Sequence, residues 1–167
     1  MTAGQAFYAK QGDTLIIKLI GDIRYTMSCS VDDFLEQWFA NKNSGTMQID
    51  LSEVECIDST SLGLLAKAAN FMHTRFGNKV TLISPNPDIT QLLDSVGFTT
   101  IFEIRPNSAL PAASMQRLHL LEPTKAELAK TMFEAHQVLS DMNEKNRDAF
   151  KDVVEALRHK LGGNNPF

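Results

Sequence analysis

Residues 56–63, Cys-Ile-Asp-Ser-Thr-Ser-Leu-Gly, decide how this chain should fold, because a strand pattern ends here and a helical pattern begins. Asp58, Ser59 and Thr60 therefore stand where a loop becomes a helix. Oxygen-bearing side chains are favoured at that place because they accept hydrogen bonds from backbone N–H groups of the first turn. The helix dipole and the same N–H groups also favour an anion. A serine here is either a helix cap or a position that can carry a phosphate.

Strand and helix patterns alternate on both sides of this stretch. Residues 15–20, Leu-Ile-Ile-Lys-Leu-Ile, are almost wholly apolar, as in a strand covered on both faces. Gly12-Asp13 predicts a hairpin turn before that run, and Gly21 predicts its end. The alternation indicates an α/β domain with a mixed sheet of about five strands flanked by helices. We expect strands over 5–11, 14–20, 46–51, 79–84 and 99–104, and helices over 28–41 (capped by Ser28 or Ser30), 61–76 and 88–95.

The composition of the chain changes after Pro106. Small residues and prolines then follow one another, which is typical of a linker, before a long helix-favouring stretch begins. We expect a first domain over residues 1–106, a linker over 107–122 and a C-terminal helical extension over 123–167.

The extension carries an apolar stripe in alternating steps of four and three residues, as in a helix with one buried face. We expect a long helix-favouring stretch from Thr124 to about Leu161. Asn146 interrupts the stripe, and a lone polar residue there either sets the register between helices or marks a break. The stripe rests on the chain's own domain, on a partner helix, or on a second copy of the chain in a homodimer. Its apolar members are Leu128, Met132, Ala135, Leu139, Met142, Ala149, Val153 and Ala156.

Composition excludes several classes of function. Hydrophobic residues make up 43% and charged residues 22% of the 167 residues, which is ordinary for a globular protein. The net charge of −4 and the lack of a basic cluster argue against nucleic-acid binding. The N-terminus lacks the order of a signal peptide, and no apolar run approaches the roughly 18 residues of a spanning helix. We therefore expect a cytoplasmic protein with no membrane and no nucleic-acid partner.

No catalytic or metal-binding pattern is found in the sequence. Asp50 and Asp58 are two carboxylates, but a catalytic pair needs a pocket and converging geometry that the sequence does not indicate. No glycine-rich loop of the nucleotide-binding kind is present. The sequence therefore predicts a protein that is not an enzyme and has no cofactor and no metal. Its histidines, which lack metal-ligand spacing, are His73, His119, His136 and His159.

The order of the expected elements, together with four motifs, resembles the STAS domain, the fold of bacterial anti-sigma factor antagonists. The resemblance covers about residues 5–105, and the chain after Pro106 lies outside it. The stretch 57–63 is its most specific part. The motifs are Gly21-Asp22-Ile23, Gln48-Ile49-Asp50-Leu51, Ile57-Asp58-Ser59-Thr60-Ser61-Leu62-Gly63 and Leu92-Leu93-Asp94-Ser95-Val96-Gly97-Phe98.

In that family, the serine directly after the aspartate is phosphorylated by a partner kinase, often itself the anti-sigma factor, and a serine phosphatase removes the phosphate. The resemblance implies that Ser59 is this phosphoacceptor. A phosphate adds about −1.5 to −2 charges and strong acceptor oxygens. The start of a helix tolerates that charge, whereas a partner docked there meets repulsion. Phosphorylation would then switch binding with little change of fold.

The resemblance also implies a partner surface around the same helix start. Ser61 stands where many family members have glycine, so Thr60 and Ser61 are competing hydroxyls. Arg24 stands where they have an aspartate near the phosphorylation site. It favours a phosphate on Ser59, indicates a different kinase, or is a solvated loop charge. The residues assigned to the partner surface are Asp58, Thr60, Ser61, Leu62 and Arg24.

The sequence thus predicts a cytoplasmic anti-sigma factor antagonist. Without a phosphate it would sequester an anti-sigma factor or switch kinase, free a sigma factor and so regulate transcription. The alternative is a STAS adaptor in a transporter or signalling assembly, where the serine needs no modification.

Overall fold

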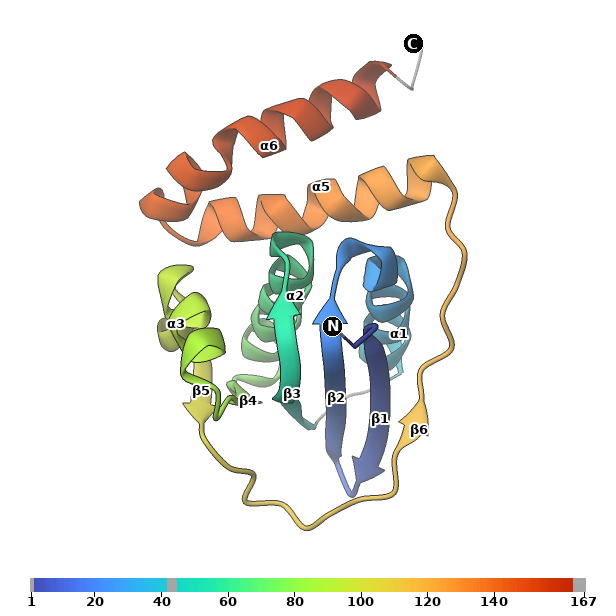
Figure 1. Cartoon of the computed structure of the whole chain (residues 1–167), viewed down its shortest axis with the longest axis vertical. Coiled ribbons are helices and arrows are strands. Elements are labelled where there is room, and N and C mark those ends of the chain that lie inside the picture. Colours follow the sequence, from blue (N-terminus) through green and yellow to red (C-terminus); the bar gives the residue numbers. More distant parts are fainter. Residues whose placement is uncertain (1, 42–44, 164–167) are drawn as a thin grey trace.

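A six-stranded mixed sheet forms the middle of the protein (Figure 1). The computed structural model describes residues 2–41 and 45–163. The strands are β1 (Gln5–Gln11), β2 (Thr14–Ile23), β3 (Thr46–Ile57), β4 (Val80–Ile83), β5 (Phe102–Arg105) and β6 (Gln116–Arg117). Their order is β5-β4-β3-β2-β1-β6; β2 to β5 are parallel, and β1 is antiparallel to both of its neighbours. The expected mixed α/β sheet is confirmed.

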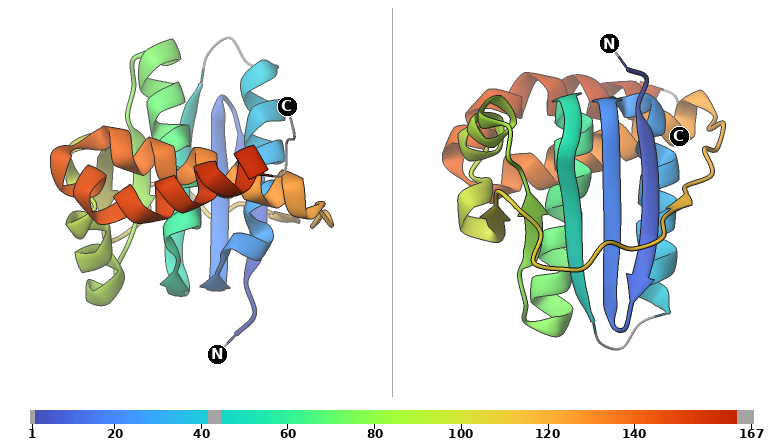
Figure 2. Two further views of the ribbon diagram at one scale, coloured as in Figure 1. Left: turned by 90° about the horizontal axis from the view of Figure 1, so that it is seen from above. Right: turned by 60° about the horizontal axis from the view of Figure 1, so that its bottom comes forward.

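The helices are grouped on one face and at one end of this sheet. They are a short 3-10 helix η1 (Tyr25–Met27), α1 (Ser28–Ala40), α2 (Ser59–Phe76), α3 (Pro87–Ser95), α4 (Phe98–Ile101), α5 (Lys125–Met142) and α6 (Glu144–Gly163). Helices α1 and α2 cover one face. Residues 106–124, here called the strap, first cross the other face, then form the edge strand β6 beside β1 and continue to α5 (Figure 2). Helices α5 and α6, here called the hairpin, lie across one end of the domain (Figure 1).

The turn between the first two strands is confirmed at Gly12-Asp13, where Gly12 has a φ of 58°. The strand end expected at Gly21 is wrong, because β2 continues to Ile23. Gly21 has a φ of 86° and lies where the register between β2 and β3 shifts, as in a β-bulge. A Cβ on Gly21 would lie 2.6 Å from the carbonyl oxygen of Thr2, so the N-terminal segment passes directly over this glycine.

Strand β2 has one fully covered face and one partly covered face. Leu15, Ile17 and Leu19 belong to the core beneath the helices. On the opposite face, Ile16 is buried and Lys18 is half-buried, and both line a hollow beneath the strap. Coverage on both faces, as the apolar run suggested, is therefore confirmed for only part of the strand.

Two further expected strands differ from the observed ones. Strand β3 extends beyond the expected end at residue 51, as far as Ile57. The strand expected over 99–104 is wrong in its first half, because Phe98–Ile101 form α4. Gly97, with a φ of 85°, turns the chain, and the hydroxyl of Thr100 donates to the Gly97 carbonyl at 2.8 Å. This local bond and the complete burial of Phe98 favour a turn of helix over an extended chain.

The serine cap expected for α1 is wrong, since no side chain caps its first turn. The hydroxyl of Ser28 instead donates to the carbonyl of Tyr25 at 2.6 Å. Ser30 lies two residues farther along and accepts a hydrogen bond from the backbone N–H of Leu121 at 2.7 Å. Ser30 therefore ties the strap to α1.

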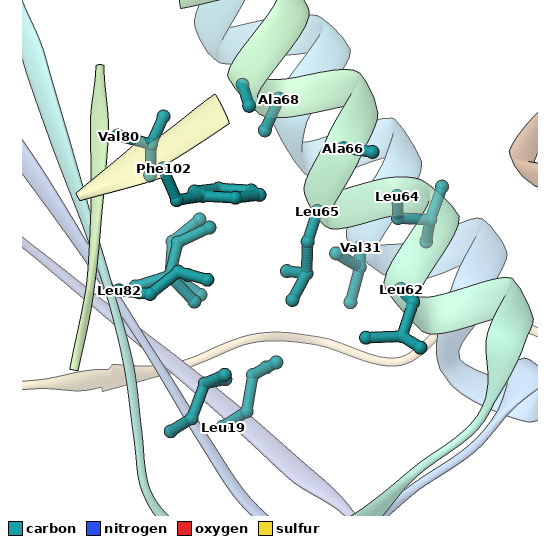
Figure 3. Close-up of a cluster of buried hydrophobic side chains, with 14 of the residues drawn as sticks. Leu19, Val31, Leu62, Leu64, Leu65, Ala66, Ala68, Val80, Leu82 and Phe102 are labelled. Atoms are coloured by element: carbon teal, nitrogen blue, oxygen red, sulfur yellow. The ribbon is translucent and has the colours of Figure 1, made fainter. Parts of the chain in front are cut away.

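The core lies between the sheet and the layer of α1 and α2. Side chains from α2 and from β2, β4 and β5 point toward one another there (Figure 3). Leu62, Leu64 and Leu65 are all buried, so α2 presents none of these three to solvent. Burying one leucine contributes roughly 1.5–3 kcal/mol. The labelled members are Leu19, Val31, Leu62, Leu64, Leu65, Ala66, Ala68, Val80, Leu82 and Phe102.

The C-terminal extension is helical, as expected, and consists of two helices with a break between them. Its start is confirmed, because Thr124 and Glu127 form a reciprocal capping box on α5. The break lies at Asn143, whose backbone is extended. The side-chain oxygen of Asn143 accepts a hydrogen bond from the backbone N–H of Asn146 at 2.8 Å and so caps the first turn of α6. Of the two readings of the polar interruption, the helix break is observed.

The expected apolar stripe is followed only as far as the end of α5. Ala135 and Leu139 join the core of the domain, whereas Ala149, Val153 and Ala156 are exposed. The second half of the stripe is therefore wrong, because the break turns α6 about its axis. Helix α5 packs on the chain's own domain, and a homodimer stays a prediction. The buried residues of α6 are Asn146 and Val154.

Candidate functional site

Asp58 is the cap of α2. Its Oδ1 accepts the backbone N–H of Ser61 at 2.9 Å, and its Oδ2 accepts the backbone N–H of Tyr25 at 2.6 Å. One carboxylate thus satisfies the first turn of α2 and holds the loop that leads into α1. The helix begins at Ser59, earlier than the expected start at residue 61. Since Asp58 is the cap, the hydroxyls of Ser59 and Thr60 are not needed for that purpose.

The hydroxyl of Ser59 contacts a histidine of the hairpin. Ser59 Oγ lies 2.8 Å from Nε2 of His136. The other ring nitrogen, Nδ1, lies 2.7 Å from the carbonyl oxygen of Met132. Because a carbonyl only accepts, we assign the ring proton to Nδ1, and Ser59 therefore donates to Nε2. This pair could not be predicted, because no spacing pattern in the sequence links residues 77 positions apart.

The other residues assigned to the partner surface differ in exposure. Thr60, Ser61 and Leu62 are buried in this structure. Asp58 and Ser59 are half-buried. A partner can reach the side chains of Thr60, Ser61 and Leu62 only if the residues that bury them at the start of α2 move.

Arg24 is exposed and makes a hydrogen-bonded ion pair with Asp22, Nε to Oδ2 at 2.6 Å. The thiol of Cys56 donates to Oδ1 of the same carboxylate, also at 2.6 Å. The hydrogen bond from Cys56 lowers the pKa of Asp22 most, and the hydrogen bond from Arg24 lowers it further, so it lies below its usual range. Asp22 in turn raises the pKa of Arg24 through its hydrogen bond and charge. The structure therefore places the guanidinium of Arg24 on Asp22, so a contact with a phosphate would require it to turn.

The hairpin crosses α2 at the turn that follows Ser59. A Cβ on Gly63 would lie 2.2 Å from the carbonyl oxygen of Ala135, and its three nearest atoms would all belong to that alanine. The backbones of α2 and α5 thus approach as closely as they do because residue 63 has no side chain. Near the turn that joins α5 and α6, Nδ2 of Asn146 donates to the carbonyl of Val96 at 2.9 Å.

The chemistry available to the Ser59–His136 pair follows from its burial. A hydroxyl that donates to an imidazole is the arrangement of an activated nucleophile. His136, however, is only 3% exposed. A nearby pocket of about 440 Å³ between α1 and α5 is lined by carboxylates such as Asp32 and Glu36 and does not include Ser59. In this structure the Ser59–His136 pair therefore forms a contact between α2 and α5.

Over residues 2–41 and 45–163, no group of three or more His, Cys, Asp and Glu side chains is placed to hold a metal ion. Among the same residues, no helix combines the length and the apolar character needed to cross a bilayer.

Comparisons with known proteins point to one family. The sequence profile of the STAS domain matches residues 7–110. A crystal structure of an anti-sigma factor antagonist from Mycobacterium paratuberculosis matches with a TM-score of 0.52 and 18% identity, over 63% of this chain and 87% of that one. The anti-sigma factor antagonist SpoIIAA in its unphosphorylated form matches with a TM-score of 0.51 and 11% identity, over 62% and 89%.

A third structure, of the protein TM1081, matches with a TM-score of 0.51 and 25% identity, over 59% of this chain and 78% of that one. A comparison with curated protein sequences finds no match. At identities below 25%, the first two structures support the fold alone. Each match covers a share of this chain about as large as the sheet domain, and most of each compared protein is covered.

Proposed function

This chain belongs to the STAS domain family, and on that premise we propose that it is an anti-sigma factor antagonist controlled by phosphorylation of Ser59. In its unphosphorylated form it sequesters an anti-sigma factor or switch kinase. A serine phosphatase restores that form, and the output is transcription by the sigma factor that is set free. Residues 1–106 are the signalling domain in this proposal, 107–122 the connection and 123–167 an accessory extension. The protein acts in the cytoplasm by binding rather than by catalysis.

The position of Ser59 carries the proposal. It is the first residue of α2 and follows the capping carboxylate of Asp58 directly. Because Asp58 already caps the helix, the Ser59 hydroxyl is available for a role other than capping. A phosphate on it would lie at the positive end of the α2 dipole, so the domain can keep its fold.

The partner surface in this proposal surrounds that helix start. Asp58 and the exposed Arg24 lie at its edge. Thr60, Ser61 and Leu62 are buried, so they act by shaping the surface unless α2 becomes uncovered. The similarity to two anti-sigma factor antagonists supports the proposal that the partner is an anti-sigma factor or switch kinase.

The test is to incubate the protein with its serine kinase and map the phosphate by mass spectrometry. We expect the phosphate on Ser59 and its complete loss in Ser59→Ala. Thr60→Ala is the matched control, because it removes the neighbouring hydroxyl and should leave labelling intact. Unchanged labelling of Ser59→Ala would refute the assignment.

A second candidate is a STAS adaptor subunit of a transporter or signalling assembly. The observation that favours it is the hydrogen bond from Ser59 to His136, which gives the hydroxyl a structural partner in the unmodified protein. Affinity purification that recovers a transporter ATPase, with neither a kinase nor an anti-sigma factor, would support this candidate. Recovery of an anti-sigma factor that no longer binds the phosphorylated protein would exclude it.

A further inference from the structure

The hairpin lies on the end of the domain where the proposed switch residue is located. We propose that it is a self-docked cover, and that phosphorylation of Ser59 or binding of a partner at this end requires the hairpin to swing away. The inference rests on the proposed function of Ser59. It adds that the chain carries its own competitor for that surface.

Two contacts show that the closed hairpin occupies the site. Ser59 donates its hydroxyl hydrogen to His136, which is buried. Phosphorylation replaces that hydrogen with a phosphoryl group, so phosphate oxygens would face the lone pair of Nε2. One turn farther along α2, Gly63 meets the backbone of Ala135 without room for even a methyl group. With a neutral imidazole, the closed hairpin therefore offers the phosphate no donor from His136, and the backbones of α2 and α5 are already in close contact one turn away.

The domain has the elements of a complete STAS fold without the hairpin. The family profile ends at residue 110, before α5 begins at Lys125. The anti-sigma factor antagonist from Mycobacterium paratuberculosis is covered over 87% of its length by a match that spans 63% of this chain. The strap that joins the two parts contains no buried residue. A movement of the hairpin thus requires no strand of the sheet domain to leave its place.

The contacts that hold the hairpin combine apolar burial with separate polar bonds. Leu139 is completely buried against the domain core. Asn146 donates to the carbonyl of Val96, and the thiol of Cys29 donates to the hydroxyl of Thr131 at 3.4 Å. Water can satisfy these polar groups in an open state, whereas the apolar surface favours closure or a partner that covers it. This combination suits a contact that must be both specific and reversible.

The experiment compares hydrogen exchange in three forms of the full-length chain. The forms are the unmodified protein, the protein with phosphoserine incorporated at position 59 during translation, and Gly63→Ala. Amides of α5 should exchange at least about tenfold faster in the second and third forms, while amides of β3 keep their protection. Asn146→Ala opens the contact from its far end and serves as a second variant if Gly63→Ala does not fold.

Gly162→Ala is the matched control, because a Cβ there meets nothing within 4 Å, and it should leave exchange in α5 unchanged or slower. The inference is overturned if α5 keeps its protection with phosphoserine at position 59, or if β3 loses protection together with α5. The second result would show that the hairpin is an integral part of the domain. Absence of phosphate on Ser59 in cells would refute the proposed function, whereas the exchange in Gly63→Ala would still report on the cover.

Discussion

The strap and the hairpin both follow the sheet domain, yet they are attached to it in different ways. The strap crosses an open sheet face, and no residue of it is buried. It is held mainly by polar bonds, such as the backbone N–H of Leu118 to the carbonyl of Ala6 at 2.8 Å, and by the pairing of β6 with β1. The hairpin places Leu139 and Ala135 in the core and Ser59 against His136. Position in the chain thus says little about which appended segment is coupled to the site.

This difference has a physical origin in side-chain size and spacing. The small residues and prolines at the start of the strap follow the sheet surface, and of its larger apolar residues Leu118 packs against the core while only half-buried. In α5, Ala135 and Leu139 are four residues apart and both join the core, and the backbone of Ala135 lies close to Gly63 of α2. We therefore expect substitutions in the hairpin to change both stability and access to Ser59, and substitutions in the strap to change neither by much.

The largest effect should come from the buried leucine of α5. Leu139→Ala removes a completely buried side chain, so we expect a loss of about 2–5 kcal/mol in the free energy of unfolding. Leu118→Ala, in the half-buried part of the strap, should cost less than about 1 kcal/mol. Urea denaturation of both variants measures the difference. Equal losses would mean that the strap and the hairpin contribute alike.

The next effect should come from the buried asparagine of α6. Asn146 is 2% exposed and donates to the carbonyl of Val96. Asn146→Ala leaves that carbonyl without its partner, and we expect a loss of about 1–3 kcal/mol. Asn107→Ala, an exposed position at the start of the strap, should change stability by no more than about 0.5 kcal/mol. Thermal melts compare the two, and a cost at position 107 as large as at 146 would contradict the distinction.

A smaller effect is expected at the junction of the two segments. Thr124 caps α5 through its hydroxyl and the backbone N–H of Glu127, at 3.1 Å. Thr124→Ala should lower stability by about 1 kcal/mol, and Thr124→Ser, which keeps the hydroxyl, should restore most of it. Hydrogen exchange in the first turn of α5 locates the change. The capping argument fails if serine and alanine give the same exchange rates.

The smallest effect is expected within the strap itself. Ser108 exchanges hydrogen bonds with the side chain of Gln48 at the sheet surface. Ser108→Ala should cost less than about 1 kcal/mol, because water can replace the hydroxyl at this exposed position. It should leave hydrogen exchange in α5 unchanged. Faster exchange in α5 would show that the strap controls the hairpin, contrary to our account.

Local patterns predicted much of the domain but not how its parts meet. The apolar runs predicted the sheet, and the run from Asp58 to Thr60 located the start of α2, although Asp58 rather than a serine proved to be the cap. A helix break was one of the two interpretations of Asn146, but its position at Asn143 was not predicted, because an extended residue between two helical patterns leaves both patterns intact. As a result, the stripe was carried through α6 in the wrong orientation.

The contact between Ser59 and His136 could not be predicted, because it depends on tertiary packing between distant segments. The one local indication was that His136 directly follows Ala135, a member of the apolar stripe. Gly63 carried a second indication that was not used, since a glycine inside a helix often marks a close approach of backbones. Neither indication specifies the partner helix, so the site could be located by sequence but its cover could not.

The central claim is that a closed hairpin hides Ser59, and the rate of Ser59 phosphorylation by its serine kinase tests it most directly. The rate should scale with the fraction of molecules that are open. We predict that Gly63→Ala and Asn146→Ala are phosphorylated roughly tenfold faster than the unmodified sequence, and that Gly162→Ala matches the unmodified sequence. Equal rates in all four proteins would contradict the claim.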